Sequence, residues 1–81
     1  MTERLETDEK IVGIKQVRRA IGLQEVETVF IAEDADLNLV QDIIDSCKKH
    51  NIPIIKAENM EKLGELCKID VNAAIAAVYK K

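Results

Sequence analysis

The amino-acid sequence predicts an α/β protein, a three-layer α-β-α sandwich with one mixed sheet of about four strands. Helix-type and strand-type segments alternate through most of the chain, which is the pattern of a sheet with helices on both faces. Residues 28–32 (Thr-Val-Phe-Ile-Ala) form a continuous β-prone apolar run, as expected of a central strand covered on both sides. With 81 residues, of which 47 % are hydrophobic, the chain has room for one core. We therefore expect residues 1–81 to form a single domain, with residues 1–9 as a short helix or arm.

The first helix of this sandwich is expected to follow a short strand. Ile11 and Val12 are β-prone, and Gly13 marks the turn after them. Apolar residues then recur at helical spacing as far as Gly22, which ends the helix. The apolar positions that predict its buried side are Ile14, Val17, Ala20 and Ile21.

The other side of this helix is basic. At 100° per residue, Lys15, Arg18 and Arg19 fall within an arc of about 100°, and Gln16 lies beside Arg19. The helix is therefore expected to present three cations and an amide outward.

Charge is unevenly distributed along the chain, although the formal net charge is only −3. Residues 10–24 carry four bases and no acid, which gives this segment a charge of +4. Residues 25–45 carry seven acids and no base. The basic segment is thus a candidate anion-binding patch on an otherwise acidic chain. The seven acids are Glu25, Glu27, Glu33, Asp34, Asp36, Asp42 and Asp45.

The second half of the chain continues the alternation. Asp36 is placed to cap a helix that ends at Asn51, with Lys48 and Lys49 near its C-terminus. Residues 53–56 and 75–79 are read as strands, although the alanines at 73–77 also suit a helix on propensity alone. Asn59 caps the helix between them. The expected buried stripes are Leu39, Val40, Ile43, Ile44 and Cys47 in the first helix, and Met60, Leu63, Gly64 and Cys67 in the second.

Several classes of protein are disfavoured. No apolar run approaches the roughly 18 residues of a membrane helix, and residues 1–10 are too charged for a signal peptide, so we expect a cytoplasmic location. Cys47 and Cys67 sit in apolar helical patterns, which favours buried thiols over a disulfide. With Phe30 and Tyr79 as the only aromatic residues, base stacking on an aromatic platform is not expected.

The sequence gives little support for catalysis, a metal site or a cofactor. The start of a calcium loop at Asp34, Asp36 and Asn38 is not continued, because Leu39 stands where the loop needs glycine and Asp45 where it needs glutamate. Helix capping by Asp36 explains the pattern better. His50 is the only histidine and has no neighbours with which to form a metal or catalytic site, so we expect a surface position.

The start of the first helix is the best candidate site. A glycine turn, backbone N–H donors and basic side chains suit a phosphate, and lysine, arginine and glutamine also suit purine edges. On these residues alone, a solvated basic helix face remains an alternative. A protein-interaction or scaffold role for the acidic segment 25–45 is a second one.

From residue 11 to residue 79 the chain resembles the kink-turn-binding ribosomal proteins of the archaeal L-seven-Ae, eukaryotic L-thirty-e and spliceosomal fifteen-point-five-K type, in particular their bacterial branch. Three blocks carry the resemblance: 13–21 (Gly-Ile-Lys-Gln-Val-Arg-Arg-Ala-Ile), 29–36 (Val-Phe-Ile-Ala-Glu-Asp-Ala-Asp) and 62–74 (Lys-Leu-Gly-Glu-Leu-Cys-Lys-Ile-Asp-Val-Asn-Ala-Ala). It implies a noncatalytic protein that binds kink turns in structured RNA such as rRNA or a riboswitch. Since nothing in the sequence requires an oligomer, we expect a monomer.

The resemblance also implies how the RNA is contacted. The first helix would enter the widened groove beside sheared G·A pairs, which an intact A-form major groove does not allow. A second loop would pack on a flipped-out nucleotide. The implied RNA-binding residues are Gly13, Lys15, Gln16, Arg18 and Arg19 in the first segment, and Ile69, Asp70 and Val71 in the second.

The chain departs from the family at four positions. Archaeal members typically have asparagine and glutamate where Lys15 and Gln16 stand, and a basic residue where Leu23 stands. Lys68 occupies a position that is usually glycine.

Overall fold

The computed structural model describes residues 10–69 and 72–80. Strands and helices alternate in the predicted order, and the segment predicted as a short helix or arm, residues 1–9, lies outside the described residues. The elements are β1 (Lys10–Val12), α1 (Ile14–Gly22), β2 (Val26–Ala32), α2 (Leu37–Lys49), β3 (Ile54–Ala57), α3 (Met60–Leu66) and β4 (Ile75–Tyr79).

Three strands differ from their predicted bounds by one or two residues. β1 begins at Lys10 and not at Ile11, β2 begins at Val26 and not at Thr28, and β3 spans Ile54–Ala57 where residues 53–56 were expected. Proline has no N–H to donate to a sheet, so Pro53 contributes only its carbonyl oxygen, which accepts from the Val29 N–H at 3.0 Å.

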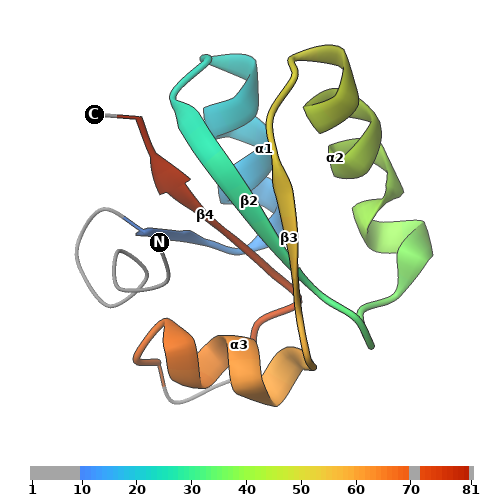
Figure 1. The fold of residues 1–81 in the computed structure, drawn as a ribbon, viewed down its shortest axis with the longest axis vertical. Coiled ribbons are helices and arrows are strands. Elements are labelled where there is room, and N and C mark those ends of the chain that lie inside the picture. The colour runs from blue at the N-terminus through green and yellow to red at the C-terminus, as the bar shows by residue number, and fades with distance from the viewer. Residues whose placement is uncertain (1–9, 70–71, 81) are drawn as a thin grey trace.

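The sheet is mixed, with the strand order β1-β4-β2-β3. β4 pairs antiparallel with both β1 and β2, while β2 pairs parallel with β3. Figure 1 shows α1 and α2 side by side on one side of the sheet and α3 on the other. The predicted three-layer sandwich is therefore correct.

This topology gathers the helix starts at one edge of the sheet. β1, β2 and β3 run in the same direction because β4 opposes both β1 and β2, and β3 is parallel to β2. Each of these three strands leads into a helix at its carboxyl end, and β4 begins at the same edge. We call this edge, formed by Gly13 and residues 33–36, 57–59 and 72–74, the helix-start edge (Figure 1).

The core is aliphatic, as the composition predicts, with Phe30 as its one large ring. β2 and β4 are buried along almost their whole length, since both lie inside the sheet and between helices. One predicted core residue is placed wrongly by the sequence pattern: Leu39 is 55 % exposed. At the first turn of α2, Leu39 lies on the edge of the apolar stripe, where only Val40 is fully covered by the sheet.

Both cysteines are free thiols inside the core, as the sequence predicts. Burial raises the pKa of Cys47 from 9.0 to about 11. Burial also raises the pKa of Cys67, and the positive charge of Lys10 lowers it by a smaller amount. Both thiols are therefore neutral at physiological pH and act as small apolar side chains. Over the described ranges, no helix is long and apolar enough to cross a membrane.

Candidate functional site

The turn from β1 into α1 is built for glycine. Gly13 has a φ of +106°, a conformation that residues with a Cβ rarely adopt. A Cβ added there would lie 2.5 Å from the Gln16 Oε1 atom, so the amide of Gln16 is folded back over the turn. The Gly13 N–H donates to the Ile75 carbonyl at 3.2 Å. The start of α1 is thereby fixed to the start of β4.

The four polar side chains predicted on the outer side of α1 are all exposed, but they divide into two groups. Arg18 lies 3.8 Å from the Asp42 carboxylate of α2, with 54 % of its side chain exposed. Such an exposed pair contributes little free energy, but it shows that Arg18 faces α2. Gln16 and Arg19 face the opposite way, toward β1.

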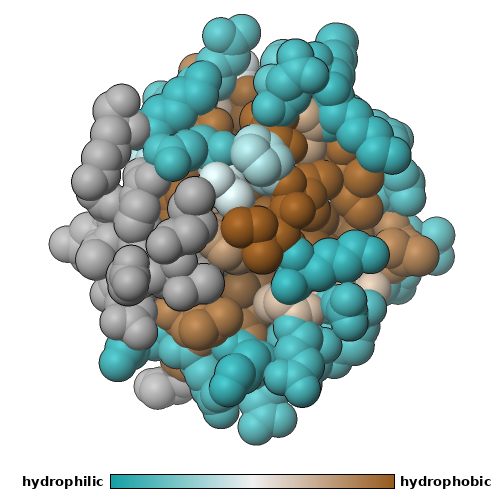
Figure 2. All heavy atoms as spheres, viewed as in Figure 1, coloured by the Kyte–Doolittle hydropathy of each residue, from teal (hydrophilic) through white to brown (hydrophobic). Residues whose placement is uncertain are grey.

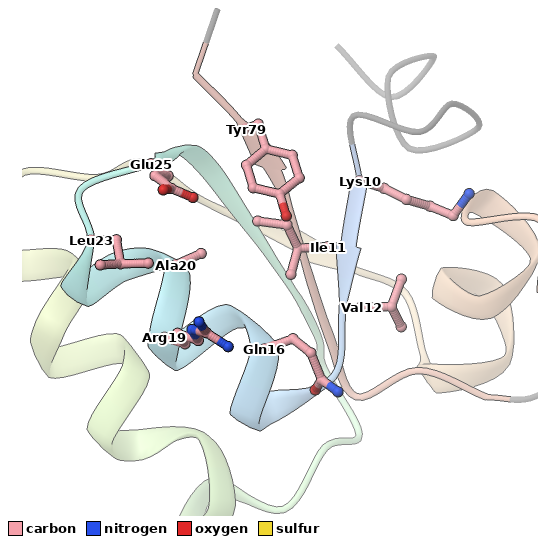
Figure 3. A pocket seen from close by; sticks show the side chains of 9 residues that line it. All are labelled: Lys10, Ile11, Val12, Gln16, Arg19, Ala20, Leu23, Glu25 and Tyr79. Carbon is pink, nitrogen blue, oxygen red and sulfur yellow. The ribbon is translucent and has the colours of Figure 1, made fainter.

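Gln16 and Arg19 line an open groove of about 520 Å³ between α1 and the β1–β4 pair. Figure 3 shows both side chains projecting from α1, with Tyr79 across the groove and Lys10 directed away from them. Tyr79 reaches this groove because β1 and β4 pair with Lys10 opposite Val78, a contact that no local sequence pattern predicts. The other lining residues are Ile11, Val12, Ala20, Leu23 and Glu25.

Two acids of the helix-start edge accept hydrogen bonds from backbone N–H groups at helix N-termini. Asp36 Oδ1 accepts from the Asn38 N–H at 2.9 Å, as the predicted cap of α2. Asp34 Oδ1 accepts from the Met60 N–H at 2.7 Å, at the start of α3. Asn59 Oδ1, the predicted cap of α3, accepts from the Lys62 N–H at 2.7 Å. Asp34 and Asp36 thus compensate the positive ends of two helix dipoles, whereas the other two acids of this edge, Glu33 and Glu58, are exposed.

The described parts of the chain contain no group of three or more histidine, cysteine or acidic residues that could hold a metal ion. Asp34 and Asp36, the start of the apparent calcium loop, accept from backbone N–H groups at the starts of two different helices. His50 is exposed at the end of α2, as predicted.

The second predicted recognition segment is described only in part. Ile69 is half-buried against the core, and its N–H donates to the Gly64 carbonyl at 3.2 Å. Asp70 and Val71 lie outside the described residues. Lys68, at a position where the family usually has glycine, has a φ of +59°. The backbone therefore keeps a conformation that suits glycine although a lysine occupies it.

The three sequence blocks come together at the helix-start edge. The Ala73 N–H donates to the Met60 carbonyl at 3.1 Å, and the Ala32 N–H donates to the Ala74 carbonyl at 3.0 Å. The next residue, Ile75, accepts from Gly13. Backbone hydrogen bonds thus join the ends of β1 and β2, the start of α3 and the start of β4.

The acidic segment 25–45 does not form one surface. Glu25 and Glu33 flank the seven-residue β2, so their backbones are separated by roughly 20 Å or more. In α2 the acids make separate contacts: Asp42 faces Arg18, and Asp45 accepts from the Gln41 amide at 3.0 Å.

Comparison with protein families identifies the chain over nearly its whole length. Residues 2–81 match the model of the ribosomal protein L7Ae/L30e/S12e/Gadd45 family. RNA-binding protein YbxF of Geobacillus stearothermophilus is 37 % identical over 76 residues, which cover 94 % of this chain and 93 % of the relative. An RNA-binding protein of Caldanaerobacter subterraneus subsp. tengcongensis is 40 % identical over 68 residues, which cover 84 % of this chain and 83 % of the relative.

Solved structures share the fold. The 15.5kD RNA binding protein of Giardia lamblia superposes with a TM-score of 0.89 at 21 % identity, over 99 % of this chain and 68 % of that one. A protein of unknown function from Bacillus halodurans C gives a TM-score of 0.86 at 20 % identity, over 98 % of this chain and 83 % of the other.

Proposed function

Because the chain belongs to the ribosomal protein L7Ae/L30e/S12e/Gadd45 family, we propose that it is a noncatalytic RNA-binding protein that recognises kink turns in structured RNA. Relatives that share more than a third of its residues over most of its length are named RNA-binding proteins, which supports the RNA partner. We further propose that it acts as a monomer in the cytoplasm.

The observation that carries this proposal is the start of α1. Lys15 and Gln16 are exposed there, Arg19 is exposed in the last turn, and the Gln16 and Arg19 side chains line the groove beside β1. The first turn of α1 contains no acid, so its N–H groups and its positive dipole end favour an anion. Asp34 and Asp36 of the same edge accept hydrogen bonds at the starts of α3 and α2, which limits their repulsion of a phosphate.

These side chains suit the chemistry of a kink turn. Sheared G·A pairs expose guanine O6 and N7, which accept hydrogen bonds from lysine or arginine, and a glutamine amide pairs with a purine edge. Arg19 and Lys15 also neutralise phosphates that crowd together where the backbone bends. Ile69 offers an apolar contact at the second segment, where the family resemblance implies a flipped-out nucleotide. A protein-interaction role for segment 25–45 has less support, because its acids are dispersed.

The test is a titration of the protein into two RNAs at two salt concentrations. One RNA contains a kink turn, and in the other its sheared G·A pairs are replaced by Watson–Crick pairs. We expect tight binding to the first alone, with a residual preference at high salt, because base-edge contacts are less salt-dependent than phosphate contacts. Equal, weak binding to both RNAs that vanishes with salt would refute kink-turn recognition.

A further inference from the structure

Asp34 makes a hydrogen bond that joins two distant parts of the chain. Its carboxylate, in the loop after β2, accepts from the backbone N–H of Met60, 26 residues away at the start of α3. At 2.7 Å this is a short, charge-assisted bond. No feature of the local sequence around Asp34 requires it.

Asp34 is not needed to cap α3. Asn59 already serves as the N-cap of α3, accepting from the Lys62 N–H at 2.7 Å. A capping side chain one residue before the helix satisfies the third helical N–H, which is the usual arrangement. The bond from Asp34 therefore adds something else: it fixes the position of the whole seven-residue helix relative to the end of β2.

Met60, whose N–H donates to Asp34, also accepts a hydrogen bond at its carbonyl oxygen. The Met60 carbonyl accepts from the Ala73 N–H at 3.1 Å, which sets the path of the chain into β4. Two residues later, Ile75 accepts from the N–H of Gly13, where α1 begins. A continuous hydrogen-bonded path thus runs from Asp34 through the start of α3 to the start of α1.

The other end of α3 carries Ile69, whose N–H is bonded to the Gly64 carbonyl of the helix. A short helix moves as a unit, so a shift at its first residue moves Ile69 relative to Gln16 and Arg19 on α1. Under the proposed function, these two sets of side chains must contact one RNA at the same time. Misplacement by about 1 Å is enough to weaken such a two-part contact severely.

We propose that Asp34 is a positioning residue for RNA recognition: its bond to the Met60 N–H holds α3 and Ile69 in register with the start of α1. This inference rests on the proposed function. It makes an unusual prediction about charge, because a carboxylate at an RNA-binding edge repels phosphate. If Asp34 acted only through its charge, its removal would strengthen binding, whereas loss of positioning weakens it.

The experiment measures kink-turn RNA affinity by fluorescence anisotropy for the full chain and three variants, at two salt concentrations. Asp34→Ala removes the acceptor, and we expect about tenfold weaker binding, which corresponds to a recognition surface that is correctly placed in about a tenth of the molecules. Asp34→Asn keeps the Oδ1 acceptor without the charge and should bind within about twofold of the wild type. Asp45→Ala removes an exposed acid farther along α2 and serves as the matched charge control. The salt slope should be unchanged in Asp34→Ala, because no phosphate contact is lost.

Met60→Pro breaks the same bond from the donor side and keeps the carboxylate. Proline is well tolerated at the first position of a helix, and Asn59 before it is extended, as a residue preceding proline should be. We expect binding as weak as in Asp34→Ala, and no further loss when the two substitutions are combined. Circular dichroism verifies that each variant is folded at the temperature of the titration.

Three outcomes would overturn either the positioning role of Asp34 or the proposed function. If Asp34→Ala binds as tightly as the wild type or more tightly, Asp34 does not position the recognition surface. Equal weakening in Asp34→Asn and Asp34→Ala would also overturn the proposal, because the charge and not the hydrogen bond would then matter. A wild-type protein that does not prefer the kink-turn RNA would instead refute the proposed function.

Discussion

The three helices begin at the same edge of the sheet, yet they begin differently. α2 and α3 start at Asp36 and Asn59, whose side chains accept from backbone N–H groups of the first turn. α1 starts at Gly13, which has no side chain with which to cap the helix, and its first turn has no acid. The side-chain caps of α2 and α3 thus bond N–H groups at their starts, whereas the start of α1 has no side-chain cap and lies beside basic and amide side chains.

The difference suggests how an acidic protein presents a surface for an anion. Two carboxylates of the helix-start edge, Asp34 and Asp36, lie at the starts of α3 and α2, where they accept hydrogen bonds and compensate the helix dipoles. α1 keeps its positive end, with Lys15 in its first turn and Arg19 exposed in its last turn. The distribution of charge within one edge therefore matters more than the net charge of −3.

The helix ends are alike. Each helix is followed by a residue at positive φ, namely Gln24, Asn51 and Lys68. In each case the next N–H reaches back to a carbonyl of the last turn, as the Ile52 N–H does to Cys47 at 2.8 Å. This is the Schellman arrangement, in which glycine is the usual residue and other residues carry strain.

The largest expected effect is at the uncapped start. Gly13→Ala places a Cβ at a φ of +106°, and we expect this backbone strain to cost about 1–3 kcal/mol in the free energy of unfolding, while the flexible Gln16 side chain moves away from the new Cβ. Gly22→Ala is the matched control, since a Cβ there meets nothing within 4 Å and should stabilise the helix by about 0.5–1 kcal/mol. Urea denaturation measures both. Equal effects at the two glycines would show that the turn at Gly13 has no special requirement.

The next effect separates the two arginines of α1. Arg19→Ala should weaken kink-turn RNA binding about tenfold and reduce the salt slope by about one, because one phosphate or base-edge contact is lost. Arg18→Ala should change affinity less than about twofold, because Arg18 faces α2 and pairs with Asp42. Titrations at several salt concentrations measure both. A larger loss for Arg18 would mean that RNA approaches α1 from the side of α2.

A smaller effect is expected at the capped start of α2. Asp36→Ala removes the acceptor for the Asn38 N–H and should lower the free energy of unfolding by about 1 kcal/mol. Asp36→Asn retains the acceptor and should cost only a few tenths of that. Thermal melting followed by circular dichroism distinguishes the two. If the asparagine variant were as unstable as the alanine variant, the carboxylate charge, and not the cap, would stabilise this start.

The smallest effect is at the helix ends. Lys68→Gly relieves the strain of a lysine at a φ of +59° and should raise the free energy of unfolding by about 0.5–1 kcal/mol. Gln24→Gly tests the same geometry at the end of α1 without a change of charge. Chemical denaturation measures the gain. Destabilisation of both variants would show that chain entropy outweighs backbone strain at these positions.

Much of the fold is predictable because it depends on local chemistry. The caps at Asp36 and Asn59 and the buried stripe of α1 follow from side-chain type and periodicity, and the structure confirms them. The last strand, Ile75–Tyr79, is also confirmed, but its prediction depends on the alternation of elements, because its alanines suit a helix on propensity. The prediction that Leu39 is buried is wrong, because an apolar residue at the edge of a stripe is buried only if a neighbouring element covers it. The candidate site is likewise predictable where it is local, at Gly13–Arg19, where Lys15, Gln16 and Arg19 are exposed as expected.

The sequence by itself determined the order of helices and strands, the aliphatic core and the basic outer side of α1, because each depends on residues a few positions apart. Only the tertiary structure decided that Arg18 faces Asp42 while Arg19 faces the groove, and that Asp34 holds Met60. These contacts follow from the strand order β1-β4-β2-β3, because the strand order determines which distant residues lie close together. Contacts between residues far apart in sequence are selected by the packing of the whole domain, which no local pattern encodes.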